Sequence, residues 1–219
     1  MIRGAIFDLD GTLLDSNPYW DRAPAVYLAT LGKQAKPSLA KAIFSMTLPE
    51  AVDYLTAEYG LMQTPQEIAN GVNAAMERFY RTETPLKPGV TSLLDALRER
   101  RIPLMVASVT DRPLVEAALR RHNIADRFDA VITTAEVGVG KHAPDIYLRA
   151  AERLGSKPSE TLVFEDALHA LQTAKRALFR TVGVFDAASD GLQDEIRSVS
   201  EFYLRDFCNL SAFLAAIEK

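Results

Sequence analysis

Hydrophobic positions along the chain change their spacing from one region to the next. A short apolar run from Ile2 to Phe7 predicts a buried strand of a parallel sheet. From Tyr19 to about Thr82, apolar residues recur at helical spacings, and Pro37, Pro49 and Pro65 fit the first turns of new helices. We expect helices and no strand in this second region.

Beyond Pro85, apolar runs and amphipathic segments alternate, which indicates βαβ units and a parallel sheet. The expected strands are Leu104–Ala107, Ala130–Thr133, Thr161–Phe164, Thr181–Phe185 and an edge strand, Phe202–Leu204. The expected helices are Val90–Arg100, Asp111 to about His122, Pro144–Leu154, Ala167–Leu178, Leu192–Ile196 and Leu210–Ile217. The pattern therefore predicts an α/β fold in which a parallel-sheet core, residues 1–15 and 86–219, is interrupted by a helical insertion, residues 16–85.

Composition limits the classes of partner. The 219 residues are 48% hydrophobic, which is enough for a substantial core. The net charge is −4, and the 25 basic residues are scattered along the chain, so we expect no nucleic-acid surface. A monomer is the default expectation. An anionic substrate would have to be held by local groups.

Compartment and redox state follow from what the sequence contains. Cys208 is the single cysteine, which excludes an internal disulfide and favours a reducing compartment, and we expect it to be buried and inert. Asp8 and Asp10 interrupt the first apolar run, so it does not read as a secretory signal. No stretch has the apolar length of a membrane span. These observations predict a soluble, cytoplasmic protein with no membrane partner.

Two carboxylates stand directly after the first predicted strand. Asp8 and Asp10 are separated by one residue and followed by a turn at Gly11. Close carboxylates at the end of a buried strand repel each other unless a cation or proton is present. Ser108 and Asp166 also follow predicted strands, and ligands of open α/β sheets bind outside the carboxyl ends of the strands. We therefore expect these distant positions to meet in one crevice.

Four segments in order resemble the motifs of the haloacid dehalogenase (HAD) superfamily. They are Asp8–Thr12, Leu104–Ser108, Gly140–Asp145 and Val163–Asp166. The insertion resembles the helical cap of the branch that contains phosphoglycolate phosphatase and β-phosphoglucomutase. The resemblance spans nearly the whole chain and implies a Rossmann-like core that carries the chemistry, with a cap that closes over small substrates.

The resemblance also implies roles for individual residues. Asp8 would be the nucleophile that stores the phosphoryl group as an aspartyl-phosphate, and Asp10 would protonate the leaving alkoxide and then activate water. Ser108 would bind a phosphate oxygen, and Lys141 would screen the phosphate from the carboxylates. Near them, Thr12 would either close the phosphate loop or bond to local backbone.

The metal site implied by the family is one for Mg²⁺. Asp8 and Asp166 would be side-chain ligands, Asp10 would contribute its backbone carbonyl, and Glu165 would act through water. Hard oxygen ligands with several retained waters suit this ion. The histidines at 122, 142 and 169 have no zinc-site spacing. Thr110 is expected near the same pocket.

The chain departs from the family pattern at a few positions. His142 replaces the usual proline of the third motif, and Ala167 and Ala170 replace a serine and a glycine after the fourth. Trp20 stands where mutases of this branch carry a histidine. We read the loop changes as fine tuning that keeps the metal site.

The expected function is Mg²⁺-dependent hydrolysis of a small phosphate monoester, with a sugar phosphate as a candidate. A β-phosphoglucomutase-like mutase is the alternative, and Trp20 disfavours it. A dehalogenase is less expected because Asp10 is retained, and a phosphonatase because no Schiff-base lysine is identified in the insertion. A non-catalytic binding module is disfavoured by the intact Asp8, Asp10, Lys141 and Asp166.

Overall fold

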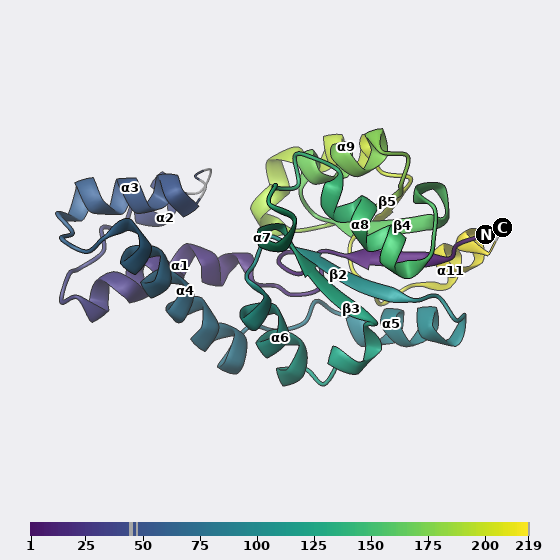
Figure 1. Cartoon of the computed structure of the whole chain (residues 1–219), viewed down its shortest axis with the longest axis horizontal. Coiled ribbons are helices and arrows are strands. Elements are labelled where there is room, and N and C mark those ends of the chain that lie inside the picture. Colours follow the sequence, from purple (N-terminus) through teal and green to yellow (C-terminus); the bar gives the residue numbers. More distant parts are fainter. Residues whose placement is uncertain (44–45, 47, 219) are drawn as a thin grey trace. The chain divides into compact units, whose positions relative to one another are not determined.

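The computed structural model describes residues 1–43, 46 and 48–218. The chain divides into two compact units, each described by itself below. One unit consists of Met1–Asp15 and Pro85–Lys219, and the other of Ser16–Thr84. Figure 1 shows the helices and strands of both.

The first unit contains a six-stranded, all-parallel sheet in the order β3-β2-β1-β4-β5-β6. The strands are β1 Gly4–Phe7, β2 Leu104–Ser108, β3 Ala130–Thr133, β4 Thr161–Glu165, β5 Arg180–Val184 and β6 Phe202–Leu204. Phe7, the last residue of β1, pairs with Val106 on one side and Phe164 on the other. The central strands consequently end at the same edge of the sheet.

Helices cover both faces of this sheet. The α-helices of the unit are α5 Val90–Glu99, α6 Arg112–Arg121, α7 Thr134–Val137, α8 Asp145–Leu154, α9 Leu168–Arg176, α10 Gln193–Val199 and α11 Ser211–Ile217. Short 3₁₀ turns occupy η1 Ala125–Arg127, η2 Pro158–Glu160 and η3 Ala187–Leu192. Figure 1 shows α8 and α9 on one face and α5 and α6 on the other.

The two faces are packed differently. On the α8 side, Ile6, Met105 and Val163 belong to a mixed aliphatic and aromatic cluster with side chains of α8. On the opposite side, the rings of Phe7 and Phe164 stack with centroids 4.2 Å apart. Because residues of a strand alternate between the faces, neighbours such as Ile6 and Phe7 build separate cores. This double burial explains the continuous apolar runs in the strands.

The second unit is helical in its described part. Its helices are α1 Asn17–Thr30, α2 Leu39–Ile43, α3 Leu48–Tyr59 and α4 Pro65–Thr82. Helix α4 begins with a capping box, in which Thr64 and Glu67 bond each other's backbone, and Pro65 occupies the first turn. A Cβ on Gly71 would lie 2.0 Å from the Tyr27 ring, so glycine is what lets α1 and α4 approach there.

The structure confirms the α/β class, the parallel sheet and the edge strand Phe202–Leu204. Helix α7 was missed because its four residues are too short for a periodic pattern. Pro24 lies inside α1, although proline breaks helices more often than it continues them. No described helix is long and apolar enough to cross a membrane.

The expectation of a buried cysteine is wrong. Cys208 is exposed, and its backbone N–H donates to Oδ1 of Asp206 in a turn. The preceding Phe207 is fully buried and fills the interior at this point. Cys208, the next residue, faces solvent.

Candidate active site

The carboxyl ends of three adjacent strands bring the expected residues together. Asp8 follows β1, Ser108 ends β2, and Glu165 and Asp166 come at the end of β4. The backbone N–H of Asp8 still donates to the Phe164 carbonyl, 3.0 Å away, so the start of the loop is held by the sheet ladder. The four side chains are buried.

A tight loop follows Asp8. Gly11 has φ 79°, a left-handed conformation that suits glycine, and its N–H donates to the Leu14 carbonyl at 2.9 Å. Thr12 is fully buried, and its hydroxyl donates to Oδ1 of Asp166 at 3.1 Å. The Thr12 side chain therefore bonds a carboxylate distant in sequence and not the local backbone, which was one of its two expected roles. It links the first and fourth motifs directly.

Lys141 lies at the centre of the acidic group. Its buried ammonium donates to Oδ1 of Asp8 and to Oε1 of Glu165. Burial alone lowers a lysine pKa, but the carboxylates of Asp8 and Glu165 outweigh it and raise the pKa of Lys141. The lysine is therefore a permanent cation in a site otherwise crowded with negative charge.

Tyr147 is a site residue that sequence reasoning missed. It projects from α8, is 1% exposed, and donates its hydroxyl to Oε1 of Glu165 at 2.8 Å. Burial and the Glu165 carboxylate raise the pKa of Tyr147 well above its usual range, so the phenol remains a donor. Helical spacing places Tyr147 on the core face of its helix, and a buried tyrosine hydroxyl needs a partner. That was the available signal.

Asp8, Glu165 and Asp166 form an acidic group, and Lys141 bonds two of its three carboxylates, those of Asp8 and Glu165. Each offers a carboxylate oxygen, and these oxygens lie within 4.8 Å of one another. Burial, followed by the Glu165 and Asp186 carboxylates, raises the pKa of Asp166 from 3.8 to about 7, while Lys87 and Lys141 oppose the rise. Burial is also the main cause that raises the pKa of Asp8, and Lys141 opposes it.

These groups can hold a metal ion. The donors are hard carboxylate oxygens that converge and are buried, and such oxygens suit a hard divalent cation. Among the residues that the structure describes, this is the one cluster of His, Cys, Asp or Glu with metal-binding geometry. The histidines lie outside it.

Asp10 and Ser108 are both bonded to Thr110. The Thr110 hydroxyl donates to Oδ2 of Asp10 at 2.7 Å, and its backbone N–H donates to Oγ of Ser108 at 3.0 Å. Ser108 is fully buried and Asp10 is half-buried. The structure therefore places Thr110 beside the site, where it bonds a side chain of the loop after β1 and one at the end of β2.

The departures from the family pattern surround this site without interrupting it. The carbonyl of His142 accepts from the Thr173 hydroxyl at 3.3 Å, which ties the Lys141 loop to α9. Ala167 precedes the first residue of α9, and Ala170 is fully buried within that helix. Alanine favours helix over glycine by about 1 kcal/mol, so Ala170 stiffens the segment after Asp166.

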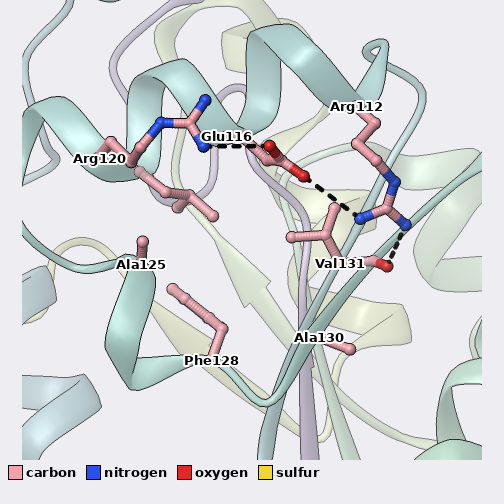
Figure 2. A pocket seen from close by; sticks show the side chains of 8 residues that line it. Arg112, Glu116, Arg120, Ala125, Phe128, Ala130 and Val131 are labelled. Atoms are coloured by element: carbon pink, nitrogen blue, oxygen red, sulfur yellow. Dashed lines mark hydrogen bonds and ion pairs between the residues drawn. The ribbon is translucent and has the colours of Figure 1, made fainter.

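A separate cavity of about 310 Å³ lies away from the acidic group, between α6 and β3 (Figure 2). Arg112 and Arg120 both form ion pairs with Glu116 at its rim. Arg112 also donates to the Val131 carbonyl at 2.7 Å. Because Glu116 partly neutralises the arginines, this cavity is not an evident anion site.

Comparison with known proteins agrees with the geometry. The model of the haloacid dehalogenase-like hydrolases matches residues 2–177. The chain belongs to this hydrolase family. It is 28% identical over 191 residues to the phosphorylated carbohydrates phosphatase of Thermotoga maritima, covering 87% of this chain and 88% of that protein.

Further similarity extends over both units. Hexitol phosphatase B of Escherichia coli is 29% identical over 185 residues, which cover 84% of this chain and 83% of that enzyme. The crystal structure of CbbY from Rhodobacter sphaeroides in complex with phosphate superposes with a TM-score of 0.82 at 24% identity. It covers 96% of this chain and 97% of that one, and shows the shared fold.

Proposed function

We propose that this chain is a Mg²⁺-dependent phosphatase of small phosphate monoesters that acts through an aspartyl-phosphate on Asp8. The observation that carries the proposal is the buried Lys141 bonded to both Asp8 and Glu165, beside Asp166. In a chain of this hydrolase family, the arrangement supports a candidate nucleophile, a buried cation and candidate metal ligands at one sheet edge.

In the first step, a carboxylate oxygen of Asp8 attacks phosphorus and the bond from phosphorus to the ester oxygen breaks. Lys141 bonds Oδ1 of Asp8, which leaves Oδ2 to attack. Thr110 bonds Oδ2 of Asp10 and so orients the carboxyl group that would give its proton to the departing alkoxide. Ser108 would donate its hydroxyl to a phosphate oxygen.

In the second step, water attacks the phosphorus of the aspartyl-phosphate and the acyl phosphate bond breaks. Asp10, now ionised, accepts the proton of that water, and Asp8 is regenerated as a carboxylate. Lys141 remains charged throughout because its pKa is raised. Inorganic phosphate is the second product.

Asp8 and Asp166 would hold the metal ion, with Glu165 supporting it and Asp10 contributing its backbone carbonyl. When bound, Mg²⁺ supplies positive charge that offsets the repulsion between an anionic carboxylate and an anionic phosphate. The oxygen donor set fits this ion. The crowding that raises the pKa of Asp8 and Asp166 fits the same conclusion.

The substrate we propose is a small phosphorylated metabolite, with a phosphorylated sugar or sugar alcohol as the leading candidate. The names of the relatives support this class, since they include a phosphorylated carbohydrates phosphatase and a hexitol phosphatase. Trp20, at the position of the mutase histidine, makes hydrolysis the expected outcome over transfer to a second hydroxyl.

The test is a phosphate-release screen over sugar phosphates and hexitol phosphates, with Mg²⁺ or with chelator. Wild-type protein should release phosphate only with the metal, and Asp8→Asn should reduce kcat by about 10³-fold or more because it removes the nucleophile. Activity that survives both chelation and Asp8→Asn would contradict the mechanism. Net isomerisation of a hexose phosphate without phosphate release would instead identify a mutase.

A further inference from the structure

A second buried lysine lies in the α/β unit, and the reaction described above does not use it. Lys87 is 7% exposed, and its ammonium donates to Oδ2 of Asp186 at 2.8 Å and to the Phe185 carbonyl. Asp186 is 2% exposed. The desolvation cost of a buried ion pair can exceed the attraction between its charges, so stability alone does not explain this pair.

The two partners come from segments that flank the active site. Lys87 is on the return segment Pro85–Lys87, where its N–H donates to the Leu13 carbonyl at 2.9 Å, directly after the Gly11 loop. Asp186 comes two residues after β5, the strand next to β4. The pair therefore joins the loop that carries Asp10 to the strand end beside Asp166.

The end of β5 is held by further bonds around Asp186. Its Oδ1 accepts from the N–H of Ala188 at 2.9 Å, and its backbone carbonyl accepts from Gln193 at 3.1 Å. Both carboxylate oxygens thus have donors in fixed positions. The lysine is restrained in turn, because Nζ bonds a carbonyl as well as the carboxylate.

The pair lies at the same sheet edge as Asp166. Strands β4 and β5 are paired with Glu165 opposite Gly183, so Asp166 and Asp186 follow the ends of neighbouring parallel strands. The charges of Lys87 and Asp186 have opposite signs and offset each other at this edge. Without its carboxylate partner, Lys87 would add an unbalanced positive charge next to a group that has to bind a divalent cation.

We propose that Lys87 and Asp186 are positioning residues of the metal site: Lys87 fixes the return segment against the end of β5, and Asp186 neutralises that lysine so that Asp8, Glu165 and Asp166 keep their affinity for Mg²⁺. The inference rests on the proposed function, since it assigns the acidic group to that ion. It adds two residues outside the four motifs.

The experiment measures Mg²⁺ binding to the full chain by titration calorimetry, without substrate. Asp186→Asn keeps size and shape but leaves Lys87 charged, and we expect the Mg²⁺ dissociation constant to rise by about tenfold through the unbalanced charge. Adding Lys87→Met in the same chain removes that charge and should restore the constant to within about threefold of wild type. If the ion pair only held the two segments together, the double variant would bind Mg²⁺ no more tightly than Asp186→Asn.

The matched control is Glu201→Gln, which breaks the ion pair with Arg180 at the opposite end of β5. It should leave Mg²⁺ binding unchanged. An unchanged dissociation constant in Asp186→Asn, or a double variant as weak as that single variant, overturns the inference. Wild-type protein that binds no Mg²⁺ contradicts the proposed metal site itself, and phosphate release measured with and without chelator separates that failure from the first.

Discussion

The two units of the chain differ in the burial of their ion pairs: among the described residues, the α/β unit has buried pairs as well as exposed ones, and the pairs of the helical unit are partly or largely exposed. In the α/β unit, the side chains of Lys141 and Asp8 are 5% and 8% exposed and bonded to each other. In the helical unit, those of Arg81 and Glu77 are 56% and 42% exposed, although they also form an ion pair. Buried pairs are expensive to desolvate, whereas exposed pairs contribute little.

The difference indicates where the fold contains an energetically unfavourable arrangement of charges. The helical unit is stabilised by ordinary means, such as the capping box at Thr64 and the Tyr19–Phe79 ring contact at 5.2 Å. The α/β unit instead retains buried carboxylates that raise one another's pKa. Perturbed pKa values of this kind cluster at functional sites.

The largest expected effect comes from the same substitution in each unit. Lys141→Met leaves Asp8 and Glu165 without their cation, so it should lower kcat by about 10²-fold or more and the free energy of unfolding by about 3 kcal/mol. Lys36→Met removes an exposed lysine paired with Glu58 in the helical unit and should leave kcat within about twofold. Phosphate release and urea denaturation measure both. Equal losses of kcat and stability in the two variants would contradict the expected difference between the buried and the exposed ion pair.

A smaller effect is expected from removing one hydroxyl in each unit. Tyr147→Phe keeps the ring but deletes the donor to Glu165, so Mg²⁺ should bind about three- to tenfold more weakly, with a loss of stability of about 1 kcal/mol. Tyr80→Phe deletes the acceptor of the Trp20 N–H and should change stability but not Mg²⁺ affinity. Titration calorimetry measures the Mg²⁺ affinity of both variants. Weaker Mg²⁺ binding in Tyr80→Phe would contradict the assignment of metal binding to the α/β unit alone.

The smallest effect is a pH dependence. The folded-state pKa of Asp166 is raised from 3.8 to about 7, so in chelated protein its contribution to stability is greatest below pH 3.8 and is lost as pH rises toward 7. Below pH 7 a proton competes with the metal at Asp166. The rise in Tm caused by Mg²⁺ should therefore be larger at pH 8 than at pH 6, by a few degrees (about 2–4 °C).

The matched control is Asp166→Asn, which should reduce this difference between the two pH values. Thermal unfolding with Mg²⁺ or chelator measures it in each case. A Tm increase that is equal at pH 6 and pH 8 in wild-type protein would show that Asp166 does not titrate in this range.

Much of this fold was predictable because continuous apolar runs and helical hydrophobic spacings are both clear in the sequence. The strand ends at Phe7, Ser108 and Glu165 could be located within one residue, and parallel pairing then brings the residues after them to one edge. The expected carboxylates, serine and lysine do meet there. Their chemical roles remain proposals for the experiments above.

What escaped prediction depends on tertiary contacts between polar groups. Tyr147 and Lys87 carry no motif, and each acquires meaning only from a carboxylate distant in sequence, Glu165 or Asp186. Periodicity assigns such residues to a helix face or a turn. It does not specify which buried polar atom will be their partner.

Arg112, at the rim of the cavity in Figure 2, lies beside an edge strand of the sheet. β3 is an outer strand of the sheet, and outer strands offer free carbonyls on which a foreign strand can add. Arg112 occupies the Val131 carbonyl and places a charged side chain along that border. Arg112 thus occupies one backbone acceptor of the edge strand, and blocked or charged edges are among the features by which proteins disfavour edge-to-edge pairing.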